Sequence, residues 1–224
     1  MAKGDEVFTL FPKQFETEPL LSAELTEQLR MGLDIQDYEF DQIFPPYYKF
    51  QSTIHWSPVI AARQIADWIV PLGLNSFIDV GCGVGKLCFL LRILTGYKIT
   101  GIEQRPKLVA IANKIIDVNN FKDISVVQMN MLDLNWDKYD IYYLYNPFQE
   151  HVTDEGLCII ENDLEFDRKN YVYYTSEVFR QLSWAKKGKV LITFHGYGGS
   201  VPPSWRMVAS RHIESGDLTM WIKE

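Results

Sequence analysis

Apolar and polar segments alternate along most of the chain in a way that predicts strands and helices in turn. Each short apolar run is followed by a stretch whose apolar residues recur at helical spacing. The first of these helices is expected to begin at Ser57, as N-cap, with Pro58 in its first turn. Strands are expected at 76–80, 98–103, 124–128, 138–145 and 189–194. Further helices are expected at 86–95, 106–119 and 171–187.

Two further strands, at 207–212 and 218–222, are expected to pair antiparallel at the end of the sheet. Together these elements predict an α/β fold with a doubly wound, mostly parallel seven-stranded sheet, an antiparallel C-terminal strand and an N-terminal helical or loop extension. In such a sheet, ligands bind at the carboxyl ends of the strands.

The first 54 residues show no clean period, apart from a helix expected at 19–31. Pro45 and Pro46 argue against a helix after it, so Tyr47 and Tyr48 are expected on a loop, where they either pack onto the domain or line a substrate cleft. We therefore divide the chain into an extension, residues 1–54, which is a cap or a substrate-side segment, and a domain of residues 55–224.

The segment from Ser76 to Gly85 runs from an apolar strand into a turn with three alternating glycines, which lead into a helix. Such a turn brings backbone amides close to a ligand at a helix N-terminus. The dinucleotide fingerprint fails because Lys86 stands where its third glycine belongs, and a phosphate-binding P-loop fails because Leu87 replaces its Ser or Thr. A glycine turn without a ligand is the alternative.

An acidic residue, Glu103, ends the second strand, 18 residues beyond Gly85. A carboxylate at this place can accept hydrogen bonds from both ribose hydroxyls of a nucleoside. Gln104, beside it, belongs to the same candidate site, and a strand-end glutamate without a role is the alternative.

The pattern Asp-x-Gly-x-Gly-x-Gly, together with Glu103, resembles the class I S-adenosylmethionine-dependent methyltransferases, and the resemblance runs from Ser57 to the end of the chain. It implies that S-adenosylmethionine is the cofactor and S-adenosylhomocysteine the product. It also implies adenine contacts after the third strand, where Asn130 and Met131 stand in place of the usual Asp and Ala. The cofactor-binding residues that it implies are Asp79, Gly81, Cys82, Gly83, Gly85, Glu103, Gln104, Asn130, Met131 and Asn146.

The sequence Asn146-Pro147-Phe148 follows the fourth strand and is similar to a motif of methyltransferases that act on amino groups. That resemblance implies that Asn146 and the Pro147 carbonyl accept hydrogen bonds from an acceptor NH₂ group. The stacking aromatic of the motif is replaced, since Gln149 stands in its place. A proline that simply ends a strand is the alternative.

His195, after the fifth strand, is a candidate general base because its ordinary pKa lies near neutral pH, and a hydrogen-bonded loop histidine is the alternative. Tyr47, Tyr48 and Tyr197 are candidates for the wall of the acceptor site. The resemblance to methyltransferases implies that His55 and Trp56 are candidates for contact with the methionine end of the cofactor, and a packed structural tryptophan is the alternative. The acidic stretch 149–170 is either a solvated insertion or a specificity loop.

A net charge of −7 and a pI near 5.2 argue against a large nucleic-acid footprint. The three cysteines, Cys82, Cys88 and Cys158, form no metal spacing, and with no signal peptide or membrane span they favour a soluble protein of the reducing cytoplasm. We expect methyl transfer to a nitrogen on a small molecule or protein. A nucleic-acid base methyltransferase and a cofactor-binding protein without catalysis are the alternatives.

Overall fold

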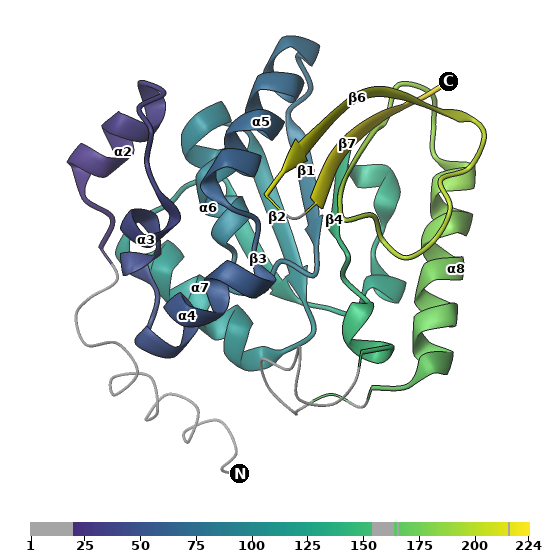
Figure 1. Cartoon of the computed structure of the whole chain (residues 1–224), viewed down its shortest axis with the longest axis horizontal. Helices are drawn as coiled ribbons and strands as arrows, with labels where there is room; N and C mark the ends of the chain where they lie inside the picture. The colour runs from purple at the N-terminus through teal and green to yellow at the C-terminus, as the bar shows by residue number, and fades with distance from the viewer. Residues whose placement is uncertain (1–19, 154–163, 165, 215) are drawn as a thin grey trace.

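Seven strands form one sheet in the order β3-β2-β1-β4-β5-β7-β6 (Figure 1). The computed structural model describes residues 20–153, 164, 166–214 and 216–224. Strand β7 runs antiparallel to its neighbours β5 and β6, and the other paired strands are parallel, which confirms the predicted fold class. The strands are β1 Ser76–Val80, β2 Lys98–Glu103, β3 Ile124–Gln128, β4 Ile141–Tyr145, β5 Val190–Phe194, β6 Trp205–Ile213 and β7 Gly216–Lys223.

Helices cover both faces of the sheet, with α5, α6 and α7 on one face and α8 on the other (Figure 1). The α-helices are α2 Ala23–Arg30, α3 Asp37–Phe40, α4 Pro46–His55, α5 Val59–Ile69, α6 Lys86–Thr95, α7 Pro106–Val118 and α8 Arg168–Trp184. The 3-10 turns are η2 Asp41–Ile43, η3 Val70–Leu72, η4 Met131–Asp133, η5 Trp136–Lys138 and η6 Gln149–His151. None of the helices in the described part of the chain is both long enough and apolar enough to cross a membrane.

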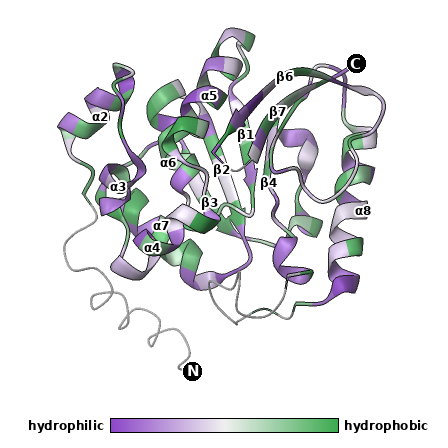
Figure 2. Ribbon diagram, in the orientation of Figure 1, coloured by the Kyte–Doolittle hydropathy of each residue, from purple (hydrophilic) through white to green (hydrophobic). Residues whose placement is uncertain are grey.

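Two hydrophobic cores lie on opposite faces of the sheet, because successive strand residues point to opposite sides. In β1, Phe77 faces the core under α5 and α6, whereas Ile78 faces the core under α8. Helix α6 is almost wholly buried and largely hydrophobic, and α8 mixes hydrophilic and hydrophobic residues along its length (Figure 2). Each large apolar side chain buried in these cores contributes roughly 1.5–3 kcal/mol to folding.

The predicted bounds of helix 86–95 and of strands 98–103 and 124–128 are confirmed residue for residue. Strand β4 begins at Ile141 and not at 138, because Trp136–Lys138 forms a 3-10 turn. The terminal strands are each longer than predicted, since their pairing runs from Trp205 opposite Lys223 to Ile213 opposite Gly216.

The prediction that Pro45 and Pro46 exclude a helix is wrong. Pro46 occupies the first position of α4, where the missing amide proton has no intrahelical partner to lose and the fixed φ suits a helix. Phe44 and Tyr48 are buried and make ring contacts with Trp56, so these two aromatics pack into the core.

Ser57 is not the N-cap of the following helix, as the sequence predicted. Its hydroxyl is hydrogen-bonded to the Tyr143 hydroxyl at 2.5 Å, and the helix α5 begins two residues later. The cap comes from a distant residue, because the Val59 amide donates to Asp37 Oδ1 at 3.0 Å. Asp37 therefore fixes the start of a helix that begins 22 residues further along the chain.

Candidate functional site

A cavity of about 340 Å³ opens at the carboxyl ends of the parallel strands. The cavity is lined by residues that follow β1, β2, β3, β4 and β5 and by residues at the end of α4. The centre of this edge lies between β1 and β4, where the strand order reverses direction, which is the usual place for a ligand in an open α/β sheet. The volume is at the lower end of the range of roughly 300–1,000 Å³ that is typical of small-molecule sites.

The glycine turn after β1 forms one side of the cavity, with Gly81 and Gly83 in its wall. Both have positive φ, +80° and +56°, which favours glycine. A Cβ on Gly81 would approach Pro147 Cβ to 3.1 Å, and one on Gly83 would lie 2.4 Å from Trp56 Nε1. Cys82 is buried behind the turn, and Gly85, with φ +81°, is the N-cap of α6, so neither lines the cavity.

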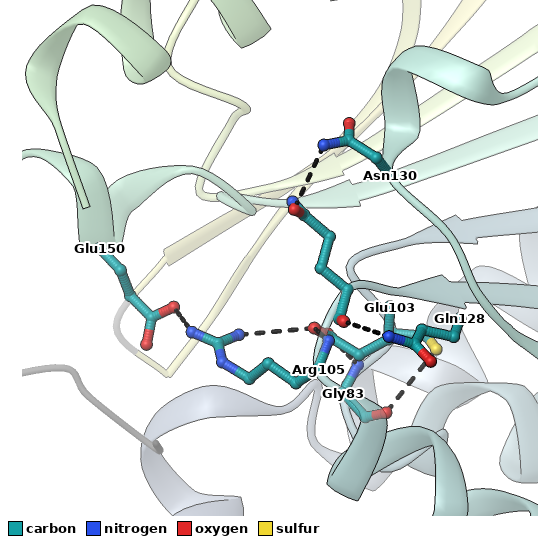
Figure 3. Close-up of polar contacts among 8 residues, drawn as sticks. Gly83, Glu103, Arg105, Gln128, Asn130 and Glu150 are labelled. Atoms are coloured by element: carbon teal, nitrogen blue, oxygen red, sulfur yellow. Dashed lines mark hydrogen bonds and ion pairs between the residues drawn. The ribbon is translucent and has the colours of Figure 1, made fainter. Parts of the chain in front are cut away.

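Glu103 connects the glycine turn to the end of β2 (Figure 3). One carboxylate oxygen, Oε2, accepts from the Gly83 amide at 3.1 Å, and the other, Oε1, accepts from the Arg105 amide at 3.0 Å. Glu103 is 6% exposed and lines the cavity. The carboxylate therefore both orders the turn and faces the space that a ligand would occupy.

Arg105 and Glu150 are cavity residues that sequence reasoning missed. The Arg105 guanidinium lies 3.6 Å from Glu103 Oε1 and forms an ion pair with Glu150, which belongs to η6 after β4 (Figure 3). It also lies over the Phe166 ring, 5.7 Å from the centroid. The available signal was a basic residue shortly after the acid that ends β2 and an acid shortly after the Asn-Pro-Phe motif that follows β4. These two strands flank β1 on either side, so both residues lie at the same edge of the sheet.

Asp79 lies beneath the glycine turn and does not line the cavity. It is 4% exposed, and the Cys88 thiol donates to its Oδ2 at 3.7 Å. Burial raises the pKa of Asp79 to about 7, with a smaller contribution in the same direction from Glu103. Asp79 therefore supports the glycine turn from beneath and does not face the ligand space.

Asn130 is held by its neighbours and is not part of the cavity wall, whereas Gln104 and Met131 are. Its amide nitrogen donates to Gln104 Oε1 at 3.3 Å (Figure 3). The same nitrogen donates to the Tyr174 hydroxyl at 2.9 Å. Its oxygen accepts from the Leu132 amide at 3.0 Å. Asn130 thus links the end of β3 to the residue that follows Glu103.

Asn146 and Pro147 form the wall of the cavity at the end of β4. Asn146 has φ +37°, which is uncommon outside glycine, and its amide donates to the Gly196 carbonyl at 2.9 Å. Its side-chain nitrogen donates to Gln149 Oε1 at 3.4 Å. The Phe148 ring stacks on the Tyr174 ring, with centroids 5.2 Å apart, so one face of the Phe148 ring is covered by Tyr174.

Three histidines line the cavity: His55, His151 and His195. Burial lowers the pKa of each below its ordinary value of 6.5, so the neutral imidazole prevails at pH 7. The His195 ring stacks on Tyr145, with centroids 5.5 Å apart. The His195 backbone has φ +56°, so two of the residues after strands, Asn146 and His195, are held in the left-handed region.

The three tyrosines named as candidates for the acceptor wall do not line the cavity. Tyr48 and Tyr197 are buried, and the Tyr197 hydroxyl donates to the Ser200 carbonyl. Tyr47 is half exposed and lies outside the cavity wall. Of the acidic stretch 149–170, the residues 154–163 and 165 lie outside the described residues, as does Cys158; Glu150, His151, Leu164 and Phe166 line the cavity.

Comparison with known proteins identifies the family model and the fold that the chain matches. A family model for a methyltransferase domain matches residues 74–207. No curated protein sequence matches the chain.

Several solved structures share the fold at low sequence identity. A putative caffeoyl-CoA O-methyltransferase from Staphylococcus aureus is 14% identical, with a TM-score of 0.54, over 98% of each chain. A putative methyltransferase from Escherichia coli is 15% identical, with a TM-score of 0.52, over 74% of this chain and 86% of that one. An RNA methyltransferase from Salinibacter ruber, in complex with S-adenosyl-L-homocysteine, is 15% identical, with a TM-score of 0.51, over 74% of this chain and 89% of that one.

Proposed function

The chain belongs to the methyltransferase domain family, as a class I S-adenosylmethionine-dependent enzyme, and on this premise we propose that its methyl acceptor is a nitrogen nucleophile on a small molecule or a protein. The observation that carries this proposal is the Asn146-Pro147 pair in the wall of the cavity at the end of β4. We propose that the Asn146 side-chain oxygen and the Pro147 carbonyl oxygen each accept one of the two hydrogens that an NH₂ group donates.

The residues around the glycine turn fit an adenosyl cofactor. Gly81 and Gly83 line the cavity and carry no side chain, so ligand atoms can approach the backbone of the turn. We propose that Glu103 binds the ribose hydroxyls and that Gln104 and Met131 contact the adenine. Asn130 orients the Gln104 side chain. In this assignment Asp79, Cys82 and Gly85 support the turn from behind.

S-adenosylmethionine, when bound, supplies a methyl group that its positive sulfur has already activated. The protein therefore has to align the nucleophile and, where needed, to accept a proton. We assign the alignment to the Asn146 side-chain oxygen and the Pro147 carbonyl, and the proton to the neutral imidazole of His195. All three residues line the one cavity.

A nucleic-acid base as acceptor is the competing proposal. A site that holds a phosphate backbone needs several cations, since each contact neutralises one phosphate. Among the described residues of the cavity wall, Arg105 is the one with a permanent positive charge, and it is paired with Glu103 and Glu150. The net charge of −7 agrees with this, so we favour the small-molecule or protein acceptor.

We further propose that residues 1–54 form a cap on the substrate side of a domain that spans residues 55–224. Helix α4 crosses this boundary and brings Ile54, His55 and the adjoining Trp56 to the cavity wall. The extension would then shape the entrance through which the acceptor reaches Asn146.

Transfer of a labelled methyl group to a panel of acceptors tests the proposal. The panel pairs primary amines and amides with hydroxyl compounds of matched shape, and adds peptides and oligonucleotides. We expect label on nitrogen, with turnover that is insensitive to moderate salt. Transfer to oxygen would overturn the proposed acceptor, and transfer to oligonucleotides that weakens steeply with salt would establish the competing one.

A further inference from the structure

A buried lysine joins the N-terminal extension to the glycine turn. Lys86 is the first residue of α6, directly after Gly85, and it is 1% exposed. Its Nζ lies 2.5 Å from Asp37 Oδ1, 2.8 Å from Asp41 Oδ1 and 2.8 Å from the Ser52 hydroxyl oxygen. The three partners come from α3, η2 and α4, so one ammonium group holds three elements of the extension.

The place of this lysine is unfavourable unless its partners are present. A cation at a helix N-terminus is repelled by the helix dipole, and a buried ammonium group loses its hydration. Two carboxylates and a hydroxyl within hydrogen-bond distance compensate for both costs. Removal of Lys86 would in turn leave Asp41, whose side chain is 4% exposed, as a buried acid without its cation.

The network connects both to the start of α5 and to the cavity wall. Asp37 Oδ1 also accepts from the Val59 amide at 3.0 Å, so it fixes the start of α5. Ser52 lies one turn before the end of α4, where His55 and then Trp56 enter the cavity wall. Trp56 in turn fills the space beside Gly83.

The apolar contacts of the extension do not fix this arrangement by themselves. The packing of Phe40, Phe44 and Tyr48 removes apolar surface from water, but such burial is non-directional. The ion pairs to Lys86 have a defined geometry, so they set where α4 ends relative to the turn. We propose that Lys86 is a positioning residue for cofactor binding, which holds the end of α4 so that Trp56 and His55 stand against the glycine turn.

This inference rests on the proposed assignment of the cavity to the cofactor and is independent of the acceptor. Lys86→Met tests it, because methionine keeps most of the buried volume and loses the charge. The dissociation constant for S-adenosylhomocysteine is measured by calorimetry, and backbone hydrogen exchange is followed by mass spectrometry. Lys189→Met is the matched control, since Lys189 is also largely buried, donates to the Tyr139 carbonyl and pairs with Asp140, and lies outside the cavity wall.

We expect Lys86→Met to weaken S-adenosylhomocysteine binding by about tenfold, with faster exchange confined to residues 37–56. Lys189→Met should leave the dissociation constant unchanged. A folded Lys86→Met protein with wild-type affinity would overturn the inference, as would an equal loss in both variants. A wild-type protein that binds no S-adenosylhomocysteine would instead overturn the assignment of the cavity.

Asp37→Asn keeps the test decisive if Lys86→Met does not fold. Asparagine still accepts from the Val59 amide, and Lys86 retains Asp41, so the fold should survive. We expect binding weakened by a few fold and faster exchange over the same residues. Unchanged affinity and exchange in Asp37→Asn would contradict the proposed role of the cluster.

Discussion

The indole of Trp56 occupies the space that any side chain at Gly83 would need, since a Cβ there would lie 2.4 Å from Trp56 Nε1. Gly83 also has φ +56°, and its amide donates to Glu103. Three constraints therefore meet at one glycine: a left-handed backbone, a bulky neighbour and a hydrogen bond to the acid at the next strand end. The shape of the turn depends on all three.

Gly83→Ala should weaken S-adenosylhomocysteine binding by at least about tenfold, because the turn must move away from Trp56. Calorimetry measures the affinity. Gly73→Ala is the matched control: Gly73 has φ +68° but nothing within 4 Å of a Cβ, so it should lose only about 1–2 kcal/mol of stability and keep its affinity. Equal affinities in the two variants would show that the turn does not hold the cofactor.

Glu103→Gln should weaken S-adenosylhomocysteine binding by roughly tenfold to a hundredfold, the range for a lost hydrogen bond to a charged group. The glutamine NH₂ group would face either the Gly83 or the Arg105 amide, both of which are donors. Glu177→Gln, which removes an acid paired with Arg180 on α8, should leave binding intact. Wild-type affinity in Glu103→Gln would contradict the assignment of the ribose hydroxyls to Glu103.

Asn146→Gly should abolish most of the turnover while the fold and cofactor binding remain. Glycine suits the φ of +37° at this position, so stability should change by less than about 1 kcal/mol, but the amide oxygen is lost. We expect kcat to fall about a hundredfold, as for other residues that orient and polarise a reacting group. Asn120→Gly, at φ +50° beyond α7 and outside the cavity wall, is the control and should keep full activity.

The sequence predicted best where local signals and tertiary structure agree. Helix 86–95 has both a glycine before it and a continuous apolar face, and strands 98–103 and 124–128 are bounded by turns, so their ends were predicted correctly. The candidate cavity was found for the same reason: glycine turns and strand-end acids lie at fixed places in a parallel sheet.

What could not be predicted depends on contacts between residues far apart in the chain. Asp37 caps α5 from 22 residues away, and Arg105 pairs with Glu150 across 45 residues. Lysine is seldom fully buried in proteins, and only the folded chain shows that Lys86 is buried. Pro46 was misjudged because a proline that forbids a helix interior is favourable in the first turn.

Turnover should depend on pH through His195. Burial and the neighbouring His212 lower its pKa below 6.5, although Asp217 opposes the shift. A general base works in its neutral form, so kcat should rise with pH and level off from about pH 6.5 upward. His195→Asn should lower kcat about a hundredfold and remove the fall in kcat at acid pH, which is the acid limb of the profile. The His212→Gln control should keep the fall in kcat at acid pH, displaced to slightly higher pH because His212 contributes to lowering the pKa of His195. His212 is exposed and lies outside the cavity wall. An acid limb that persists in His195→Asn would assign the proton to another group.

Asp79→Asn should stabilise the protein at alkaline pH and not at acid pH. Burial raises the pKa of Asp79 from 3.8 to about 7, so the folded state favours the protonated acid. Stability from this group is fully present below pH 3.8 and is lost as the pH rises to about 7, because the unfolded chain ionises first. Asparagine does not titrate, so the difference in free energy of unfolding should grow to the order of a few kcal/mol in favour of the variant by pH 8. Denaturant unfolding at pH 5 and pH 8 measures it, with Asp67→Asn on α5 as the control for a general charge effect. A difference that is the same at both pH values would mean that Asp79 is ionised throughout and that a positive partner compensates for its burial.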